Sequence, residues 1–168
     1  MKILALDIGT KLGWAVGTPT EVECFGTEIL ARDKDITAFR KLRWDRRLDP
    51  RIPTLFRFLV KTHLEQKLDW VVFEDVQFAS TTLQAHLWAS LRGAIWVFAA
   101  ENKLSIECLA TGKLKLFATG NGAADKDQME RALRRDTRFF SEIKLDDNAV
   151  DAIHLLKWSQ HVLKNAKV

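Results

Sequence analysis

The chain has 168 residues, of which 47% are hydrophobic and 29% charged, and its formal net charge is +4. This length and composition are typical of a single globular domain over residues 1–168 and exclude a disordered chain. No apolar run approaches the roughly 20 residues of a membrane span, and the N-terminus does not resemble a signal peptide. We therefore expect a cytoplasmic protein without a membrane partner, in which Cys24 and Cys108 are buried, reduced thiols.

Five β-strands are predicted, at residues 2–7, 13–17, 21–30, 69–74 and 105–110. The first and the fourth contain continuous apolar runs, Ile3–Leu6 and Trp70–Phe73, as expected for strands that are buried on both faces. The first three strands follow one another through short turns and indicate an antiparallel meander.

Helices are predicted at residues 53–66, 80–102, 111–118, 125–136 and 146–164, with a further helical segment at 35–47. Pro50 and Pro53 interrupt that further segment. Helices and strands that alternate after an initial meander are typical of an α/β fold. We expect a mixed five-stranded sheet, with antiparallel strands first and parallel strands after them, flanked by helices.

Acidic residues stand at the ends of the two apolar runs. Asp7 closes the first run, and Glu74 closes the second. Each has an ordinary structural explanation, because aspartate often caps a turn and a glutamate at a sheet edge is often paired with an arginine or lysine. Together, however, they place two carboxylates at the ends of buried strands and suggest part of a divalent-metal site.

The last helix adds further carboxylates. Asp147 and Asp151 are four residues apart, so they lie about 40° apart on one face of the helix. Asp146 and Asp147 can cap the helix, but Asp151 lies a full turn inside it. Hard oxygen ligands suit Mg²⁺ or Mn²⁺, and a pair of such ions promotes phosphodiester hydrolysis. The acidic residues thus predict a metal-dependent nuclease.

Basic residues gather in two places. The first cluster interleaves cations with aromatic residues, as a nucleic-acid surface does, although a solvated helix face is an equal alternative. It consists of Arg40, Lys41, Arg43, Arg46, Arg47 and Arg51, with Phe39 and Trp44 among them. The second set flanks a turn with Gly120 and Gly122, where a backbone can approach a phosphate closely. It consists of Lys113, Lys115 and Lys126.

Taken in order, several of these segments resemble the RuvC family of Holliday junction resolvases, which have the RNase H-like fold. The matching stretches are Leu4–Thr10, Gly13–Ala15, Val71–Val76, Lys113–Met129 and Asp147–Ala152. The Gly-Asn-Gly-Ala-Ala-Asp-Lys stretch at residues 120–126 is the most specific of them, whereas residues 31–68 match nothing in that family. The resemblance implies an endodeoxyribonuclease that resolves four-way DNA junctions by paired, metal-dependent nicks.

The resemblance also implies roles for individual acidic residues. Asp7, Glu74 and Asp151 would be ligands for Mg²⁺ or Mn²⁺, with two ions in each active site. The family commonly has an acid or a histidine three residues before the last aspartate, where this chain has Asn148. The fourth ligand is therefore either Asp147, one residue earlier, or Asn148 through its amide oxygen.

Contacts with DNA are implied in the same way. Lys115 and Lys126 would contact or polarise the scissile phosphate, and Phe78 would stack on bases at the junction. The compact chain with its basic insertion also suits a phage or prophage version of such an enzyme.

Members of the family are homodimers that place two active sites on opposing strands of the junction. We expect the helix over residues 80–102, which carries Trp88 and Trp96, to form the dimer surface. Packing of this helix on the sheet explains each tryptophan equally well.

Other functions remain open. Residues 6–11 also resemble YqgF-type nucleases that act on ribosomal RNA precursors, although residues 120–126 and Glu74 argue against that function. The Asp-x-Gly-Thr motif also occurs in actin-like ATPases and sugar kinases, which need two such domains and a longer chain. Asn148 leaves open a non-catalytic junction-binding protein that has lost a metal ligand.

Overall fold

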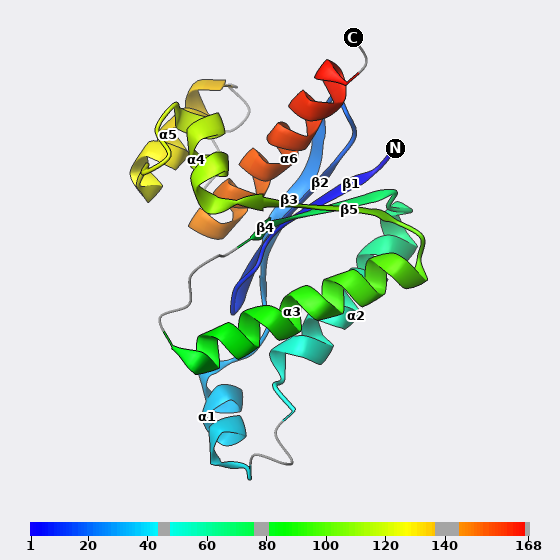
Figure 1. Cartoon of the computed structure of the whole chain (residues 1–168), viewed down its shortest axis with the longest axis vertical. Helices are drawn as coiled ribbons and strands as arrows, with labels where there is room; N and C mark the ends of the chain where they lie inside the picture. Colours follow the sequence, from blue (N-terminus) through cyan, green and yellow to red (C-terminus); the bar gives the residue numbers. More distant parts are fainter. Residues whose placement is uncertain (44–47, 76–80, 137–144, 167–168) are drawn as a thin grey trace.

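One mixed sheet forms the centre of the molecule (Figure 1). The computed structural model describes residues 1–43, 48–75, 81–136 and 145–166. The sheet has the order β3-β2-β1-β4-β5 and consists of β1 Ile3–Asp7, β2 Lys11–Gly17, β3 Val22–Ile29, β4 Trp70–Asp75 and β5 Ser105–Ala110. β1, β2 and β3 pair antiparallel, whereas β4 pairs parallel with both β1 and β5. The predicted meander followed by parallel strands is confirmed.

Helices cover both faces of this sheet, with α2 and α3 on one face and α4, α5 and α6 on the other (Figure 1). Their bounds are α1 Asp33–Lys41, α2 Arg51–Gln66, α3 Thr82–Glu101, α4 Thr111–Thr119, α5 Lys126–Asp136 and α6 Asp147–Asn165. Pro53 lies within the first turn of α2 instead of at its start, because an amide in the first turn has no intrahelical partner to lose. The predicted segment 35–47 is helical only as α1, and its residues 44–47 lie outside the described ranges.

The central strands separate two hydrophobic cores. Ile3 and Ala5 of β1 pack with α4, α5 and α6, whereas Leu4 and Leu6 pack with α2 and α3. Successive side chains of a strand point to opposite faces, so a strand between two helical layers is apolar at every position. This explains why β1 and β4 are continuous hydrophobic runs that end abruptly in acidic residues.

The structure also bears on the expectations about cysteines and membranes. Cys24 and Cys108 are both free, but Cys24 is only partly buried and Cys108 is exposed. The prediction of buried thiols is therefore wrong for Cys108, because β5 is an edge strand whose outer positions α3 covers incompletely. Within the described ranges, no helix combines the length and the hydrophobicity needed to cross a membrane.

Gly13 controls how closely α6 approaches the sheet. It lies opposite Asp7 in the β1–β2 pairing, and a Cβ atom at Gly13 would come within 1.9 Å of the carbonyl oxygen of Asn148. The first turn of α6 therefore rests directly on the backbone of β2. This close contact brings the start of α6 beside the end of β1.

We predict that Gly13→Ala destabilises the protein, because the added methyl group meets backbone that cannot turn aside. Overpacking costs about 1–3 kcal/mol, which lowers the Tm of a chain of this size by several degrees. Thermal unfolding followed by circular dichroism measures the change. Gly93→Ala on α3 is the matched control: its Cβ meets nothing within 4 Å, and alanine favours a helix, so its Tm should stay equal or rise. An unchanged Tm for Gly13→Ala would contradict the close approach of α6.

Candidate active site

Three carboxylates meet at one edge of the sheet. Asp7 ends β1, Glu74 lies one residue before the end of β4, and the parallel pairing of Leu6 with Phe73 carries both side chains to the same edge. α6, which rests on β2, adds Asp151 from its second turn. The carboxyl ends of parallel strands are where sheets of this kind commonly bind ligands.

Burial and mutual repulsion dominate the electrostatics of this group. Burial raises the pKa of Asp7 well above its ordinary value, and the charges of Glu74 and Asp151 raise it further. Burial also raises the pKa of Asp151 to about 7, with the charge of Glu74 as the next cause. Glu74 itself is only 7% exposed, and burial raises its pKa too. Carboxylates crowded in this way favour a bound cation, which would remove the repulsion between them.

Two lysines from neighbouring helices lie beside the carboxylates. Lys115 of α4 lowers the pKa of both Glu74 and Asp151 through its charge. Lys126, the first residue of α5, places its Nζ 2.8 Å from Oδ2 of Asp147. The side chains of Lys126 and Asp147 are 76% and 52% exposed, so this ion pair faces solvent. The expected contact of Lys115 and Lys126 with the scissile phosphate stays a prediction.

Reciprocal capping fixes where α5 begins. Asp125 Oδ1 accepts a hydrogen bond from the amide of Gln128 at 2.8 Å, and Gln128 Oε1 accepts one from the amide of Asp125 at 2.9 Å. These two bonds form a capping box. Because the helix is started there, Lys126 leaves its first turn next to the acidic end of α6.

The two alternatives for a fourth ligand have different partners. Asp147 bonds to Lys126, and its charge raises the pKa of Asp151. The side-chain amide of Asn148 instead donates to Oδ1 of Asp146, which is the N-cap of α6. Asp146 thus has the capping role that is its ordinary explanation.

Sequence reasoning missed Thr111, which donates a hydrogen bond from its hydroxyl to Oε1 of Glu74. β5 pairs with β4 so that Glu74 lies opposite Leu109, and Thr111 follows two residues later as the first residue of α4. This bond counteracts part of the effect of burial on the pKa of Glu74. The signal in the sequence is a hydroxyl residue just past the strand that neighbours Glu74, and it is visible only once the strand pairing is known.

A second missed contact holds the end of β4 from the other face. Arg92 of α3 forms an ion pair with Asp75, the residue after Glu74. The guanidinium carbon of Arg92 also lies 5.9 Å from the ring centre of Trp96, which is 52% exposed. Arg92 therefore connects the surface of α3 to the strand that carries Glu74.

Comparison with known proteins decides the family. A family model described as crossover junction endodeoxyribonuclease RuvC matches residues 21–156, which is most of the chain. The chain belongs to the RuvC family. The matched range begins after Asp7 and therefore does not cover it. The expected metal-binding role of Asp7 is supported instead by its position at the end of β1.

Individual RuvC proteins agree in length and in fold. A RuvC from Endomicrobium trichonymphae is 29% identical over 183 residues, covering 100% of this chain and 88% of that protein. The solved structure of Thermus thermophilus RuvC has a TM-score of 0.71 at 17% identity and covers 98% of this chain and 97% of that one. The same protein solved in complex with a Holliday junction substrate also has a TM-score of 0.71 at 17% identity, with 96% of each chain covered. The predicted RNase H-like fold and RuvC resemblance are both confirmed.

Three of the remaining residues predicted for DNA contact in this RuvC member lie in the described ranges, and they are all exposed. Lys113 is exposed in the first turn of α4, near Lys115. Arg40 is exposed on α1, which lies beyond α2 and α3 in Figure 1, and Arg43 is exposed just past the end of α1. The predicted residues Arg46, Arg47 and Phe78 lie outside the described ranges.

Arg51 belongs to the same basic run but has a structural position. Its side chain is 13% exposed, and its Nη2 lies 2.6 Å from Oδ2 of Asp49. Its Nη1 donates to the hydroxyl of Thr10 at 3.0 Å. Arg51 therefore ties the start of α2 to the turn between β1 and β2, and it is not part of an open basic surface.

The acidic side chains of the site are not arranged as the ligands of a bound metal ion in this structure. Within the described ranges, no three His, Cys, Asp or Glu side chains are already arranged to hold a metal ion. Glu74 is held by Thr111 and Asp147 by Lys126, while the like charges repel one another. The oxygen donors and their raised pKa values nevertheless fit a hard divalent cation.

We predict that Thr111→Val slows DNA cleavage by roughly 10- to 100-fold, because hydrogen-bond partners of metal ligands commonly matter by that factor. Thr111→Ser keeps the hydroxyl and should stay within about threefold of wild type, as expected for an effect on positioning. Rates should be measured at several metal concentrations, since a misplaced Glu74 raises the metal concentration needed for half-maximal rate. Equal rates and metal requirements for valine and serine would show that the hydroxyl does not position Glu74.

Proposed function

We propose that this protein is a metal-dependent endonuclease that resolves four-way DNA junctions by paired nicks. The convergence of three carboxylates from β1, β4 and α6, in a member of the RuvC family, supports this function most directly. Asp7, Glu74 and Asp151 would hold Mg²⁺ or Mn²⁺, in keeping with the preference of these ions for carboxylate oxygen. When bound, such ions supply Lewis-acid activation of water and stabilise the leaving oxygen.

The two lysines would bind the substrate. Lys115 is half-buried and its charge acts on Glu74 and Asp151, whereas Lys126 is exposed to solvent. An exposed ion pair contributes about 0–1 kcal/mol, so Lys126 can leave Asp147 at little cost when a phosphate arrives. Asp147 is then free to turn toward Asp151 as the fourth ligand, whereas Asn148 stays bonded to the cap of α6. We therefore favour Asp147 over Asn148.

We predict that Asp7→Asn, Glu74→Gln and Asp151→Asn each lower the cleavage rate at least roughly 100-fold, because Lewis-acid stabilisation is worth several kcal/mol. Junction affinity without divalent metal should change much less, since none of these residues is cationic. Asp127→Asn, on the exposed side of α5, is the control and should cleave normally.

The substrate is tested with labelled four-way junction, linear duplex and structured RNA, each with Mg²⁺ or Mn²⁺. Symmetric nicks in the junction alone, with 5′-phosphate ends, are the expected result. Cleavage of RNA would instead favour the YqgF-like alternative. Tight junction binding by wild type without cleavage would favour a non-catalytic protein.

We predict that Asp151→Asn raises the Tm of the metal-free protein at pH 8, because it removes one of the mutually repelling charges. Since the pKa of Asp151 in the folded protein is about 7, its protonation stabilises wild type at low pH, and that stabilisation is lost as the pH rises through 7. The Tm advantage of the variant should therefore shrink at pH 6. Adding Mn²⁺ should raise the Tm of wild type but not of Asp151→Asn. A lower Tm for the variant at pH 8 would contradict this account of the cluster.

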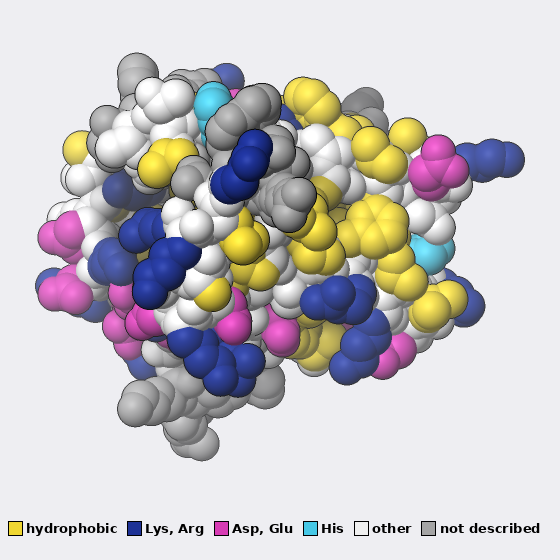
Figure 2. Space-filling view, turned by 90° about the horizontal axis from the view of Figure 1, so that it is seen from below, with side chains coloured by type: hydrophobic (Ala, Val, Ile, Leu, Met, Phe, Trp, Pro, Cys, Tyr) yellow, Lys and Arg dark blue, Asp and Glu magenta, His cyan; other side chains and the backbone are white. Residues whose placement is uncertain are grey.

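We also propose that the protein forms a homodimer through α2 and α3. Phe56, Val60 and Leu64 recur every four residues on α2 and are 40%, 37% and 63% exposed, and α3 adds Trp96 and Val97 at 52% and 57%. Figure 2 views the molecule from this side and shows hydrophobic side chains gathered on the face. The surface expected on the helix at 80–102 is thus extended by α2, while Trp88 packs against the core. Exposed apolar patches of this kind mark interaction surfaces.

We predict that Val60→Glu converts the dimer to a monomer, because the substitution places a charge in the centre of the apolar surface. Light scattering coupled to gel filtration measures the mass. Lys164→Glu, on α6 at the other face of the sheet, is the control and should leave the mass unchanged. A monomeric wild type, or a dimeric Val60→Glu variant, would count against this interface.

A further inference from the structure

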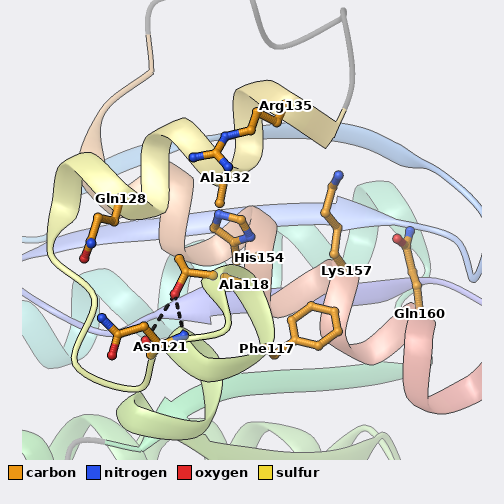
Figure 3. Close-up of a pocket in the computed structure, with 10 residues that line it drawn as sticks. Phe117, Ala118, Asn121, Gln128, Ala132, Arg135, His154, Lys157 and Gln160 are labelled. Carbon is orange, nitrogen blue, oxygen red and sulfur yellow. Dashed lines mark hydrogen bonds between the residues drawn. The ribbon is translucent and has the colours of Figure 1, made fainter.

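A pocket of about 680 Å³ lies between α4, α5 and α6, apart from the three carboxylates (Figure 3). This volume is in the range of sites that hold small ligands. Arg135 of α5 and Lys157 of α6 line it, and Phe117 of α4 forms part of its wall. In Figure 3 Lys157 extends from α6 toward the end of α5 that carries Arg135, with the ring of Phe117 seen face-on below.

The polar groups of the pocket suit an anion. The described residues that line it include two cations and no carboxylate. Asn121 uses its Oδ1 to accept the amide of Ala123 at 3.0 Å, and Gln128 uses its Oε1 to accept the amide of Asp125 at 2.9 Å. Because both oxygens are engaged inside the protein, the NH₂ groups of these side chains are the atoms that can bond a ligand.

The two cations come from different parts of their helices. Arg135 lies in the last turn of α5, where a cation complements the helix dipole. Lys157 lies in the middle of α6 and lines the same pocket. Phe117 remains 38% exposed, although its ring is fixed against His161 with the ring centres 5.5 Å apart. Two cations and a fixed aromatic ring that line one pocket suit one nucleotide, with stacking for the base and charge for the phosphate.

The pocket lies on other faces of the two helices than the residues of the carboxylate site. Lys157 comes six residues after Asp151 on α6, which at about 100° per residue turns it roughly 120° round the helix. Arg135 comes nine residues after Lys126 on α5, which turns it roughly 180° round that helix. The pocket is therefore a separate site from the carboxylates.

We infer that this pocket anchors a nucleotide of the DNA substrate away from the cut, with Arg135 and Lys157 on its phosphate and Phe117 against its base. The inference rests on the proposed junction-resolving function. It adds a contact outside the metal site that affects affinity and leaves the chemical step alone.

Paired substitutions on the same two helices provide the test. Arg135→Gln with Lys157→Gln removes both cations of the pocket. Arg131→Gln with Lys164→Gln removes one arginine of α5 and one lysine of α6 that do not line it. Both double variants change the net charge equally, so a general electrostatic effect is the same in each. Thermal unfolding checks that both are folded.

Junction binding is measured by fluorescence anisotropy without divalent metal, between 50 and 200 mM salt. Loss of the contacts to this one phosphate should make the slope of log affinity against log salt about 0.9 smaller, with at least tenfold weaker binding at low salt. The control pair should stay within about threefold of wild type. Equal losses for the two pairs would overturn the inference.

Two further measurements separate the alternatives. In cleavage assays the pocket variant should show a raised KM and a kcat within about threefold of wild type, whereas a fall in kcat alone would overturn the anchoring role.

Deoxyadenosine monophosphate and inorganic phosphate, each at 1 mM, are added to wild type in a thermal-shift assay. A rise in Tm with the nucleotide, and no change in junction affinity for the variant, would instead assign the pocket to a free nucleotide. Failure of wild type to cleave any junction would refute the proposed function, and the binding slopes would still report on the pocket.

Discussion

The parallel pairing of β1 with β4 is the constraint on which the site depends. It brings Asp7 and Glu74 to one edge of the sheet, where burial opposes the ionisation of both. Gly13 then allows α6 to rest on β2 and add Asp151 to the same group. The concentration of negative charge at this edge destabilises the folded chain, and active sites commonly show such a compromise between stability and function.

Glu74 and Asp147 have different kinds of hydrogen-bond partner. Glu74 receives a neutral hydroxyl from Thr111, a bond that fixes its direction without cancelling its charge. Asp147 receives the full charge of Lys126, but at an exposed position where the pair is easily separated. Glu74 is therefore held in place, while the exposed Asp147 remains able to rearrange.

Local sequence patterns were sufficient for the strands and for the principal acids, since apolar runs that end in Asp7 and Glu74 are visible without any pairing. Thr111 and Arg92 were not predictable, because each acts on β4 from an element distant in sequence. The sequence also does not separate the two parts of the broad apolar face of α2: Leu55 and Leu59 are buried, whereas Phe56 and Val60 are exposed. Arg51 belongs to the basic run in the sequence, but its contacts with Asp49 and Thr10, which give it a structural role, depend on the fold.

Arg92 lies between two regions that are usually considered separately. Its guanidinium lies over the ring of Trp96 at the proposed subunit contact. It also forms an ion pair with Asp75, the residue that follows Glu74 in the chain. In the proposed dimer, a partner subunit that covers Trp96 would also exclude water from around Arg92 and so strengthen the ion pair of Arg92 with Asp75. An unpaired subunit would then be a poorer nuclease than a paired one. A resolvase with this property would be protected against leaving a junction with a single, unmatched break.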